Sequence, residues 1–275
     1  MNKHILRKMT LENGLRKAIS NNEFILHYQP QVNVKTGKII GMEALIRWNT
    51  RKEGLISPGE FIPLAEETRL IIPIGEWVLY NACKQAKILY DLGYNHLKLA
   101  VNLSPLQFLH ENAVDMMSKI LDETGFNPHY LEIEITEGVA VSDAQEAIMK
   151  MQDLRNLGVR ISIDDFGTGY SSLLYLKQFP INSLKIAQPF IQDITKNTSD
   201  KLMVHSMISM AHGLGLSVIA EGVEIMQQLQ ILSDFDCDDV QGYMLSKPLT
   251  FKQFHTIIES GGIQSDFNVV INHKA

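Results

Sequence analysis

The stretch RISIDDFGTG, residues Arg160–Gly169, joins a short apolar run to two adjacent carboxylates and two glycines. The run reads as a β-strand that ends at Asp164. Gly167 and Gly169 allow the backbone to turn sharply after it. Helical patterns lie on both sides, so this part of the chain predicts a strand enclosed by two helices.

The same alternation of strand and helix extends outward along the chain. The predicted strands are Phe24–Gln31, Ile39–Arg47, Leu97–Leu103, Leu131–Thr136, Arg160–Asp164, Ser183–Ile186, Ser217–Ala220 and Asp239–Gln241. The predicted helices are Ile74–Leu92, Leu106–Thr124, Ser142–Leu157, Ser171–Gln178, Lys201–Leu214 and Met226–Phe235. Gly125, Gly158 and Gly215 are placed to end helices, whereas Ser142, Asp143, Ser171 and Ser172 are placed to begin them.

The connections between the strands predict their directions. Only Val34–Lys38 separates the first two strands, which is the spacing of an antiparallel hairpin. Helices separate the later strands, so those pairs should be parallel. The expected fold is α/β, a modified TIM-like (β/α)8 barrel with an antiparallel first strand. A doubly wound open sheet is the alternative.

Composition narrows the class of protein. The chain of 275 residues has 45% hydrophobic residues and a net charge of −6, so a globular domain is expected and binding to duplex nucleic acid is not. No segment reaches the ~18 apolar residues of a membrane span. The only cysteines, Cys83 and Cys237, form no zinc pattern and predict reduced core residues. We therefore expect a cytoplasmic protein, or the cytosolic part of a larger membrane-anchored one.

Polar residues recur near the ends of successive predicted strands. They are Glu43, Asn102, Glu132, Glu134, Asp164, Asp165, Lys185, Glu221 and Gln241. In (β/α)8 barrels the C-terminal ends of the strands form the catalytic face. Clustered carboxylates raise one another's pKa unless cations neutralise them, and oxygen ligands favour Mg²⁺ or Mn²⁺. Tandem Asp164 and Asp165 can serve two metal ions, an arrangement suited to phosphodiester cleavage.

A series of short motifs occurs along the chain in a fixed order. One is Glu43-Ala44-Leu45, followed by Arg47-Trp48. The others are Tyr28-Gln29-Pro30, Ser57-Pro58, Phe61–Glu66, Val101–Ser104, Glu134–Glu137, Asp164–Ser172, Leu184–Ile186, Ala220–Glu224 and Gln241–Tyr243. With these motifs the sequence resembles the EAL-domain family of cyclic di-GMP phosphodiesterases, which is named after its Glu-Ala-Leu motif. The resemblance covers roughly residues 12 to 260 and implies hydrolysis of cyclic di-GMP to linear pGpG with two Mg²⁺ or Mn²⁺ ions.

The resemblance also implies roles for individual residues. Glu43, Asn102, Glu134 and Asp164 correspond to ligands of the first metal ion, and Asp164 and Asp165 to ligands of the second. Glu221 corresponds to a metal-site and catalytic glutamate, and Lys185 to the lysine beside the attacking water. Gln29, Leu45, Arg47 and Tyr243 correspond to substrate contacts. Glu137, Glu224 and Gln241 correspond to supporting groups, with Glu137 anchoring the loop after Asp165. Purely structural roles for Lys185, Gln241 and Glu224 are the alternatives, and Glu132 has no assigned role.

One position departs from the family pattern. The family usually reads Leu-Lys-Ile-Asp where this chain has Leu184-Lys185-Ile186-Ala187. By strand alternation, Ala187 should face the same way as Lys185 and remove a carboxylate from the site. The alternative function is therefore an impaired EAL domain that binds cyclic di-GMP or a protein partner without cleavage.

The sequence further suggests a division of the chain and its partners. We expect a helical lead-in over residues 1–20, the EAL domain over 21–260 and a C-terminal tail over 261–275. The lead-in is of the kind that joins an upstream sensory or cyclase domain. The family resemblance implies a homodimer.

Overall fold

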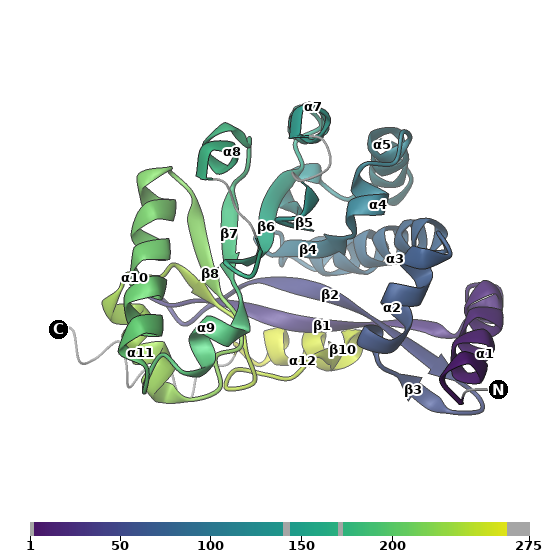
Figure 1. The fold of residues 1–275 in the computed structure, drawn as a ribbon, viewed down its shortest axis with the longest axis horizontal. Helices are drawn as coiled ribbons and strands as arrows, with labels where there is room; N and C mark the ends of the chain where they lie inside the picture. The colour runs from purple at the N-terminus through teal and green to yellow at the C-terminus, as the bar shows by residue number, and fades with distance from the viewer. Residues whose placement is uncertain (1–2, 140–143, 170–172, 263–275) are drawn as a thin grey trace.

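A long antiparallel hairpin, β1 (Phe24–Asn33) and β2 (Ile39–Thr50), crosses the molecule (Figure 1). Gly37 between the strands has a φ of 66°, a left-handed conformation that glycine adopts without steric cost. The computed structural model of the chain describes residues 3–139, 144–169 and 173–262. The predicted hairpin is present.

The remaining strands close a barrel onto this hairpin. They are β4 (Lys98–Leu103), β5 (Leu131–Thr136), β6 (Arg160–Phe166), β7 (Ser183–Ile186), β8 (Ser217–Ala220) and β9 (Asp239–Val240). Each pairs in parallel with the next, from β2 through to β9, and β9 pairs antiparallel with β1. The barrel with a reversed first strand is therefore confirmed, and the open sheet is wrong because the β9–β1 pairing closes the ring.

Two short strands lie outside the ring and were not predicted. β3 (Gly54–Ile56) pairs with the end of β2, and β10 (Leu249–Thr250) pairs with β1. Segments of two or three residues are too short to show a strand pattern in the sequence.

The helices surround the barrel. They are α1 (Lys3–Ala18), α2 (Pro58–Glu67), α3 (Ile71–Asp91), α4 (Pro105–Phe108), α5 (Ala113–Thr124), α7 (Ala144–Asn156), α8 (Leu173–Gln178), α9 (Gln188–Gln192), α10 (Thr198–Gly213), α11 (Met226–Asp234) and α12 (Phe251–Glu259), with the 3₁₀ turn η1 (Pro128–Tyr130). Gly125, Gly158 and Gly215 have positive φ after α5, α7 and α10, so the predicted helix ends are confirmed. In the described part of the chain, no helix is long and apolar enough to cross a bilayer.

Some predicted helix bounds changed. The helix expected over Leu106–Thr124 is two helices, α4 and α5, separated after Leu109. Ser104 and Gln107 form a capping box that begins α4. The predicted helix-starting residues at 142, 143, 171 and 172 lie outside the described residues.

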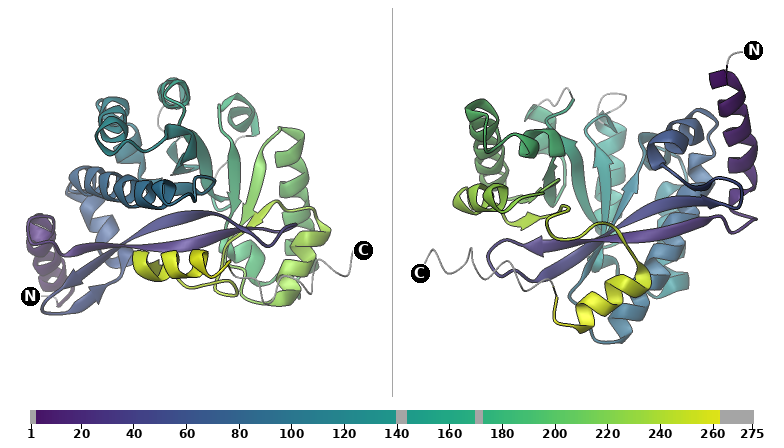
Figure 2. Two further views of the ribbon diagram at one scale, coloured as in Figure 1. Left: turned by 180° about the vertical axis from the view of Figure 1, so that it is seen from behind. Right: turned by 90° about the horizontal axis from the view of Figure 1, so that it is seen from below.

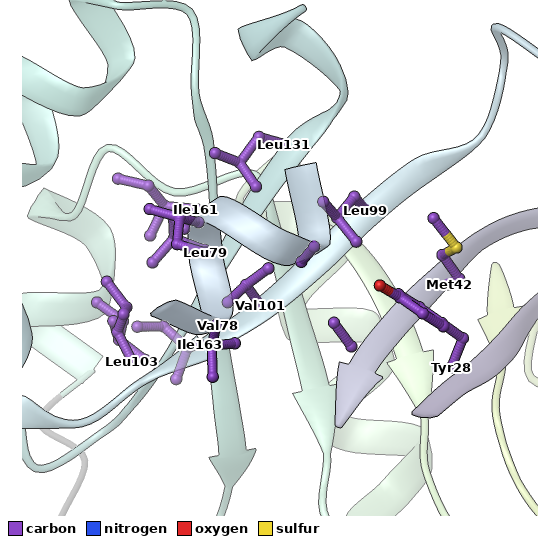
Figure 3. Packing of buried hydrophobic residues seen from close by; sticks show 14 of the residues in the cluster. Tyr28, Met42, Val78, Leu79, Leu99, Val101, Leu103, Leu131, Ile161 and Ile163 are labelled. Carbon is purple, nitrogen blue, oxygen red and sulfur yellow. The ribbon is translucent and has the colours of Figure 1, made fainter. Parts of the chain in front are cut away.

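The helices pack against the side chains that point outward from the barrel strands. In Figure 3, Val78 and Leu79 of α3 lie with Leu99 and Val101 of β4 in the buried hydrophobic cluster. The buried residues of α3 recur at helical spacing, including Ile71, Ile74, Val78 and Ala82. This layer holds the strands whose inward and rim side chains form the site.

The first and last described helices also pack on the barrel (Figure 2). α12 lies on β1, where the rings of Phe254 and Tyr28 have centroids 6.2 Å apart. α1 buries Leu11, Leu15 and Ala18 and contacts α2. The division of the chain at residues 20 and 260 stays a prediction.

Candidate active site and metal centre

The rim formed by the C-terminal ends of the parallel strands carries the predicted polar residues. Gln29 of β1 lies opposite Glu43 of β2, and Asn102 of β4 is paired with Glu134 of β5. Around the rim follow Asp164 and Asp165 on β6, Lys185 on β7, Glu221 directly after β8 and Gln241 directly after β9. The barrel thus brings together polar side chains from the ends of its seven parallel strands and from the antiparallel strand β1.

Lys185 lies fully buried at the centre of this group. Its Nζ is 2.7 Å from Glu221 Oε1, 2.8 Å from Glu134 Oε2 and 3.3 Å from Asp164 Oδ1. Glu43 Oε2 is 3.6 Å away. Burial alone would lower the pKa of Lys185, but these carboxylates together raise it well above the usual value. The lysine is therefore a permanent positive charge inside the barrel.

One ammonium group does not balance four carboxylates. Burial and the neighbouring carboxylates raise the pKa of Glu134 well above its usual value. Burial raises the pKa of Glu221 to about 7, although Lys185 opposes the shift. Burial would also raise the pKa of Glu43, but Lys185 and hydrogen bonds from Gln241 and Asn102 hold it below the usual value. The cluster therefore needs either bound protons or further cations at neutral pH.

A β-bulge brings both tandem aspartates to the rim. Pairing between β6 and β7 shifts register between Ile163 and Phe166, and Asp165 has a left-handed φ of 53°. A regular strand would point Asp164 and Asp165 to opposite faces. Instead, ligand oxygens of Asp164, Asp165 and Glu221 all lie within 4.8 Å of one another. Aspartate tolerates the left-handed region better than most residues, so the sequence permits this bulge.

These residues fit a divalent metal ion. The three clustered ligands are carboxylate oxygens, the donors that Mg²⁺ and Mn²⁺ prefer. Buried Glu134 Oε1 has no hydrogen-bond partner among the described residues, so it is available to a cation. Asn102 Nδ2 donates to Glu43 Oε1 at 2.6 Å, so the Asn102 amide lies beside another carboxylate of the rim.

Glu137 holds the loop that follows the bulge. Its Oε1 accepts a hydrogen bond from the backbone N–H of Gly167. Gly167 has a φ of 95°, and a Cβ there would lie 2.8 Å from the ring of Phe190. The contact predicted between Glu137 and this loop is thus present in the described part of the loop.

A glutamine pair fixes Glu43 from the opposite side. Gln241 Nε2 donates to Glu43 Oε2 and, at 3.1 Å, to Gln29 Oε1. Gln29 Nε2 donates to the carbonyl of Ser246 at 3.1 Å. Gln241 and Gln29 therefore position the Glu43 carboxylate and connect it to the loop after β9.

The rim opens into a cleft of about 320 Å³. It is lined by Gln29, Glu43, Leu45, Asp164, Asp165, Gln188, Glu221, Gly222, Glu224, Gln241, Gly242 and Tyr243. Of the predicted substrate contacts, Gln29, Leu45 and Tyr243 face this cleft. Gln188 was not predicted, although it lies two residues beyond a predicted strand, and its side chain packs closely over Gly222.

Arg47 lies in a neighbouring, more apolar pocket of about 510 Å³. Leu45 lines both cavities, so the two are adjacent. Asn102 also lines the second pocket. Arg47 Nη1 donates to the carbonyl of Ile46 at 2.9 Å, which leaves its other donors available. Arg47, the predicted phosphate contact, therefore lies to one side of the carboxylate cluster.

Three further residues considered in the sequence are Ala187, Glu224 and Glu132. β7 ends at Ile186, so the fully buried Ala187 is the residue before α9 and does not continue the strand alternation. Glu224 is exposed in the loop before α11 and lines the cleft. Buried Glu132 pairs with Arg160 Nε at 3.0 Å, which explains a carboxylate that had no assigned role.

Comparison with known proteins adds an independent observation. Residues 12–248 match the EAL domain as a sequence family. The bifunctional diguanylate cyclase/cyclic di-GMP phosphodiesterase MucR of Pseudomonas aeruginosa is 42% identical over 253 residues, which are 92% of this chain and 37% of that protein. The cyclic di-GMP phosphodiesterase PdeR of Escherichia coli is 36% identical over 249 residues, 90% of this chain and 37% of that protein.

A solved structure has the same fold. The PaMucR phosphodiesterase in complex with c-di-GMP aligns with a TM-score of 0.87 and 43% identity, covering 89% of this chain and 99% of that chain. The chain spans about a third of the length of the curated relatives it matches, between 31% and 38% for three of them.

Proposed function

Because this chain belongs to the EAL domain family, we propose that it hydrolyses cyclic di-GMP to linear pGpG. The observation that carries the proposal is the convergence of Asp164, Asp165 and Glu221 oxygens on one rim beside buried Lys185. The names of MucR and PdeR, which are cyclic di-GMP phosphodiesterases, support the choice of substrate.

Two divalent ions, Mg²⁺ or Mn²⁺, would complete this site. Glu43, Asn102, Glu134 and Asp164 would hold the first ion, and Asp164 and Asp165 would hold the second. Bound there, the ions would neutralise phosphate charge and lower the pKa of water. The unpartnered oxygen of Glu134 and the clustered oxygens around Asp164 support this assignment.

Glu221 and Lys185 act on the attacking water and on the phosphate. Burial raises the pKa of Glu221 to about 7 in the metal-free protein, and its carboxylate would hold the water that attacks phosphorus and accept a proton from it. Lys185 Nζ, 2.7 Å from Glu221 Oε1, keeps its charge and opposes the negative charge that develops on the phosphate oxygens. The oxygen of the water forms a new bond to phosphorus as the bond from phosphorus to the 3′ oxygen breaks, and the 3′ oxygen takes a proton from solvent and leaves as a hydroxyl group.

The cleft supplies the substrate contacts. Gln29 presents an amide, Leu45 an apolar surface and Tyr243 an exposed ring for a guanine base. Arg47, in the adjacent pocket, presents a guanidinium group suited to phosphate.

A second candidate function rests on Ala187. A receptor that binds cyclic di-GMP without cleaving it is favoured by the absence of the carboxylate that the family usually has there. Ala187 is fully buried at the start of α9 and cannot cap that helix. The ligand set listed above is complete, which favours the enzyme over the receptor.

A turnover assay separates the two. Purified protein with Mg²⁺ or Mn²⁺ should convert cyclic di-GMP to pGpG, detected by chromatography. Binding without product would reject the enzyme and support the receptor, and Ala187→Asp would then test whether that position is responsible. Failure of both binding and cleavage would reject both functions.

The partners proposed from the sequence extend beyond this chain. MucR is named as both a cyclase and a phosphodiesterase, which supports an attached cyclase or sensory domain. A homodimer stays a prediction, to be checked by light scattering.

A further inference from the structure

We propose that Lys247 is a substrate-binding residue that contacts the phosphate of the cyclic dinucleotide that is not being cleaved. The inference rests on the proposed function, because it concerns the same cleft and the same dianionic substrate. It adds a cation on the loop after β9, where the family motifs described above end at Tyr243.

Lys247 lies beside Tyr243, a residue that lines the cleft. Its Nζ is 5.6 Å from the centroid of the Tyr243 ring. Tyr243 lines the cleft and is 56% exposed, so its ring is accessible to a base. The cation–π contact keeps the ammonium group beside this ring when no phosphate is present.

The backbone that carries Lys247 is fixed to the rim. The N–H of Met244 donates to the carbonyl of Val223 at 3.0 Å, and the carbonyl of Ser246 accepts from Gln29 Nε2 at 3.1 Å. A Cβ on Gly242 would lie 2.1 Å from the Val223 carbonyl oxygen, so only glycine allows this close approach. The side chain of Lys247 therefore starts from a defined position and only its exposed stem is free to move.

The cleft is lined by acidic residues, so a cation beside it would favour binding of an anionic substrate. Glu43, Asp164, Asp165, Glu221 and Glu224 line it, and each is a carboxylate. Metal ions at the Asp164 cluster would attract the scissile phosphate. The second phosphate of the cyclic dinucleotide would still be repelled by the carboxylates that line the cleft. Lys185 is buried behind the carboxylates and cannot reach it.

Arg47 and Lys247 suit different tasks. Arg47 is half-buried and is held by the Ile46 carbonyl, so its position is set. Lys247 is an exposed ammonium group on a flexible stem, which can follow a phosphate that is not fixed by metal ions. The two cations thus provide one rigid and one adaptable contact for the same substrate.

Steady-state kinetics and binding of Lys247→Ala, Lys247→Arg and a matched control test the proposal. The control is Lys252→Ala, an exposed lysine on neighbouring α12. In Lys247→Ala we expect KM, and the Kd where binding is measured without turnover, to rise roughly fivefold with kcat unchanged. Affinity should also fall less steeply with added NaCl, and Lys247→Arg should restore both properties.

Guanosine, which carries no phosphate, distinguishes a phosphate contact from support of the Tyr243 ring. If Lys247 contacts phosphate, inhibition by guanosine is the same in Lys247→Ala and wild type. Equal weakening for guanosine and the cyclic dinucleotide would overturn the proposal, as would a Lys247→Ala variant that matches Lys252→Ala. Those results leave the proposed function intact if the wild type cleaves cyclic di-GMP. A wild type that binds cyclic di-GMP without cleaving it rejects the proposed hydrolysis, and the Kd values of the Lys247 variants then decide the Lys247 proposal. A wild type that neither binds nor cleaves it overturns both.

Discussion

At the scale of single residues, the site places one buried ammonium group among several carboxylates. Buried Lys185 contacts carboxylates of Glu134, Asp164 and Glu221, and a buried charge left without a partner is costly. Glu43, which also lies near Lys185, is held by hydrogen bonds from Asn102 and Gln241. Removing one member should therefore affect metal binding and turnover more than the fold of distant parts.

Glu43→Ala should remove turnover. Glu43 is a proposed ligand of the first metal ion. Its loss would also remove the acceptor of the hydrogen bonds from Asn102 and Gln241. We expect kcat to fall by about 10³-fold or more and Mn²⁺ binding to weaken, measured by product formation and calorimetry. Glu123→Ala, an exposed residue on α5, should match wild type. Normal turnover in Glu43→Ala would contradict the ligand assignment.

Metal binding should depend on pH through Glu221. Its pKa in the metal-free protein is raised to about 7, so below this pH a proton occupies the carboxylate and must leave when metal binds. The affinity for Mg²⁺ should rise as pH increases through 7, by about tenfold per pH unit while one proton is released.

Calorimetry in two buffers with different ionisation enthalpies would count the protons released. Glu221→Gln should release fewer protons than wild type. A proton count and an affinity that do not change between pH 6 and 8 would exclude this role of Glu221.

At the scale of elements, the strands were predictable and the short helices were not. In Leu131–Thr136 every second residue is a buried Leu or Ile, because helices cover the outer face of the barrel, so alternation and length identify this strand. α9 has five residues, and α2 contains Pro63, which masks its helical pattern. Helix α2 forms because Pro58 occupies its first turn, where no N–H partner is required.

The geometry of the site depended on irregularities that the sequence pattern does not display. Strand alternation predicts that Asp164 and Asp165 point apart, yet the bulge turns both to the rim. The same rule assigned Ala187 to the face of Lys185, but β7 has already ended. The candidate site residues could be identified from their residue types and their order along the chain. The directions of their side chains could be found only from the backbone structure.

Gly167→Ala tests how tightly the loop after β6 is packed. Its φ of 95° is unfavourable for alanine, and the new Cβ would lie 2.7 Å from Met207 Cε and 2.8 Å from the Phe190 ring. The methionine can move, whereas the ring is less able to. Gly93→Ala is the matched control, because Gly93 has a φ of 98° with no atom within 4 Å of the added Cβ.

Both variants should lose about 1 kcal/mol of unfolding free energy from backbone strain. Gly167→Ala should lose roughly 1–3 kcal/mol more from overpacking, and its turnover should fall because the loop carries Asp165. Urea denaturation gives the first quantity and product formation the second. Equal stability of the two variants would show that Phe190 does not confine the loop.

At the scale of the whole molecule, α1 is part of the packed structure. Leu15 is 2% exposed, whereas Leu6 on the same helix is 44% exposed. Leu15→Ala should lower the free energy of unfolding by about 2–5 kcal/mol, and Leu6→Ala should change it by less than about 0.5 kcal/mol. Chemical denaturation of both variants checks this, and a Leu15→Ala variant as stable as wild type would mean that α1 is dispensable.

The reversed first strand has a consequence for how control could reach the site. Because β1 runs against β2, Phe24 at its start lies opposite Trp48, beyond Glu43 in the direction of the rim. In a barrel whose strands are all parallel, the first strand would instead begin at the floor, away from the chemistry. The chain therefore enters the barrel from the side of the carboxylate rim, and a displacement of α1 would be transmitted along one hairpin to Gln29 and Glu43 without crossing the barrel.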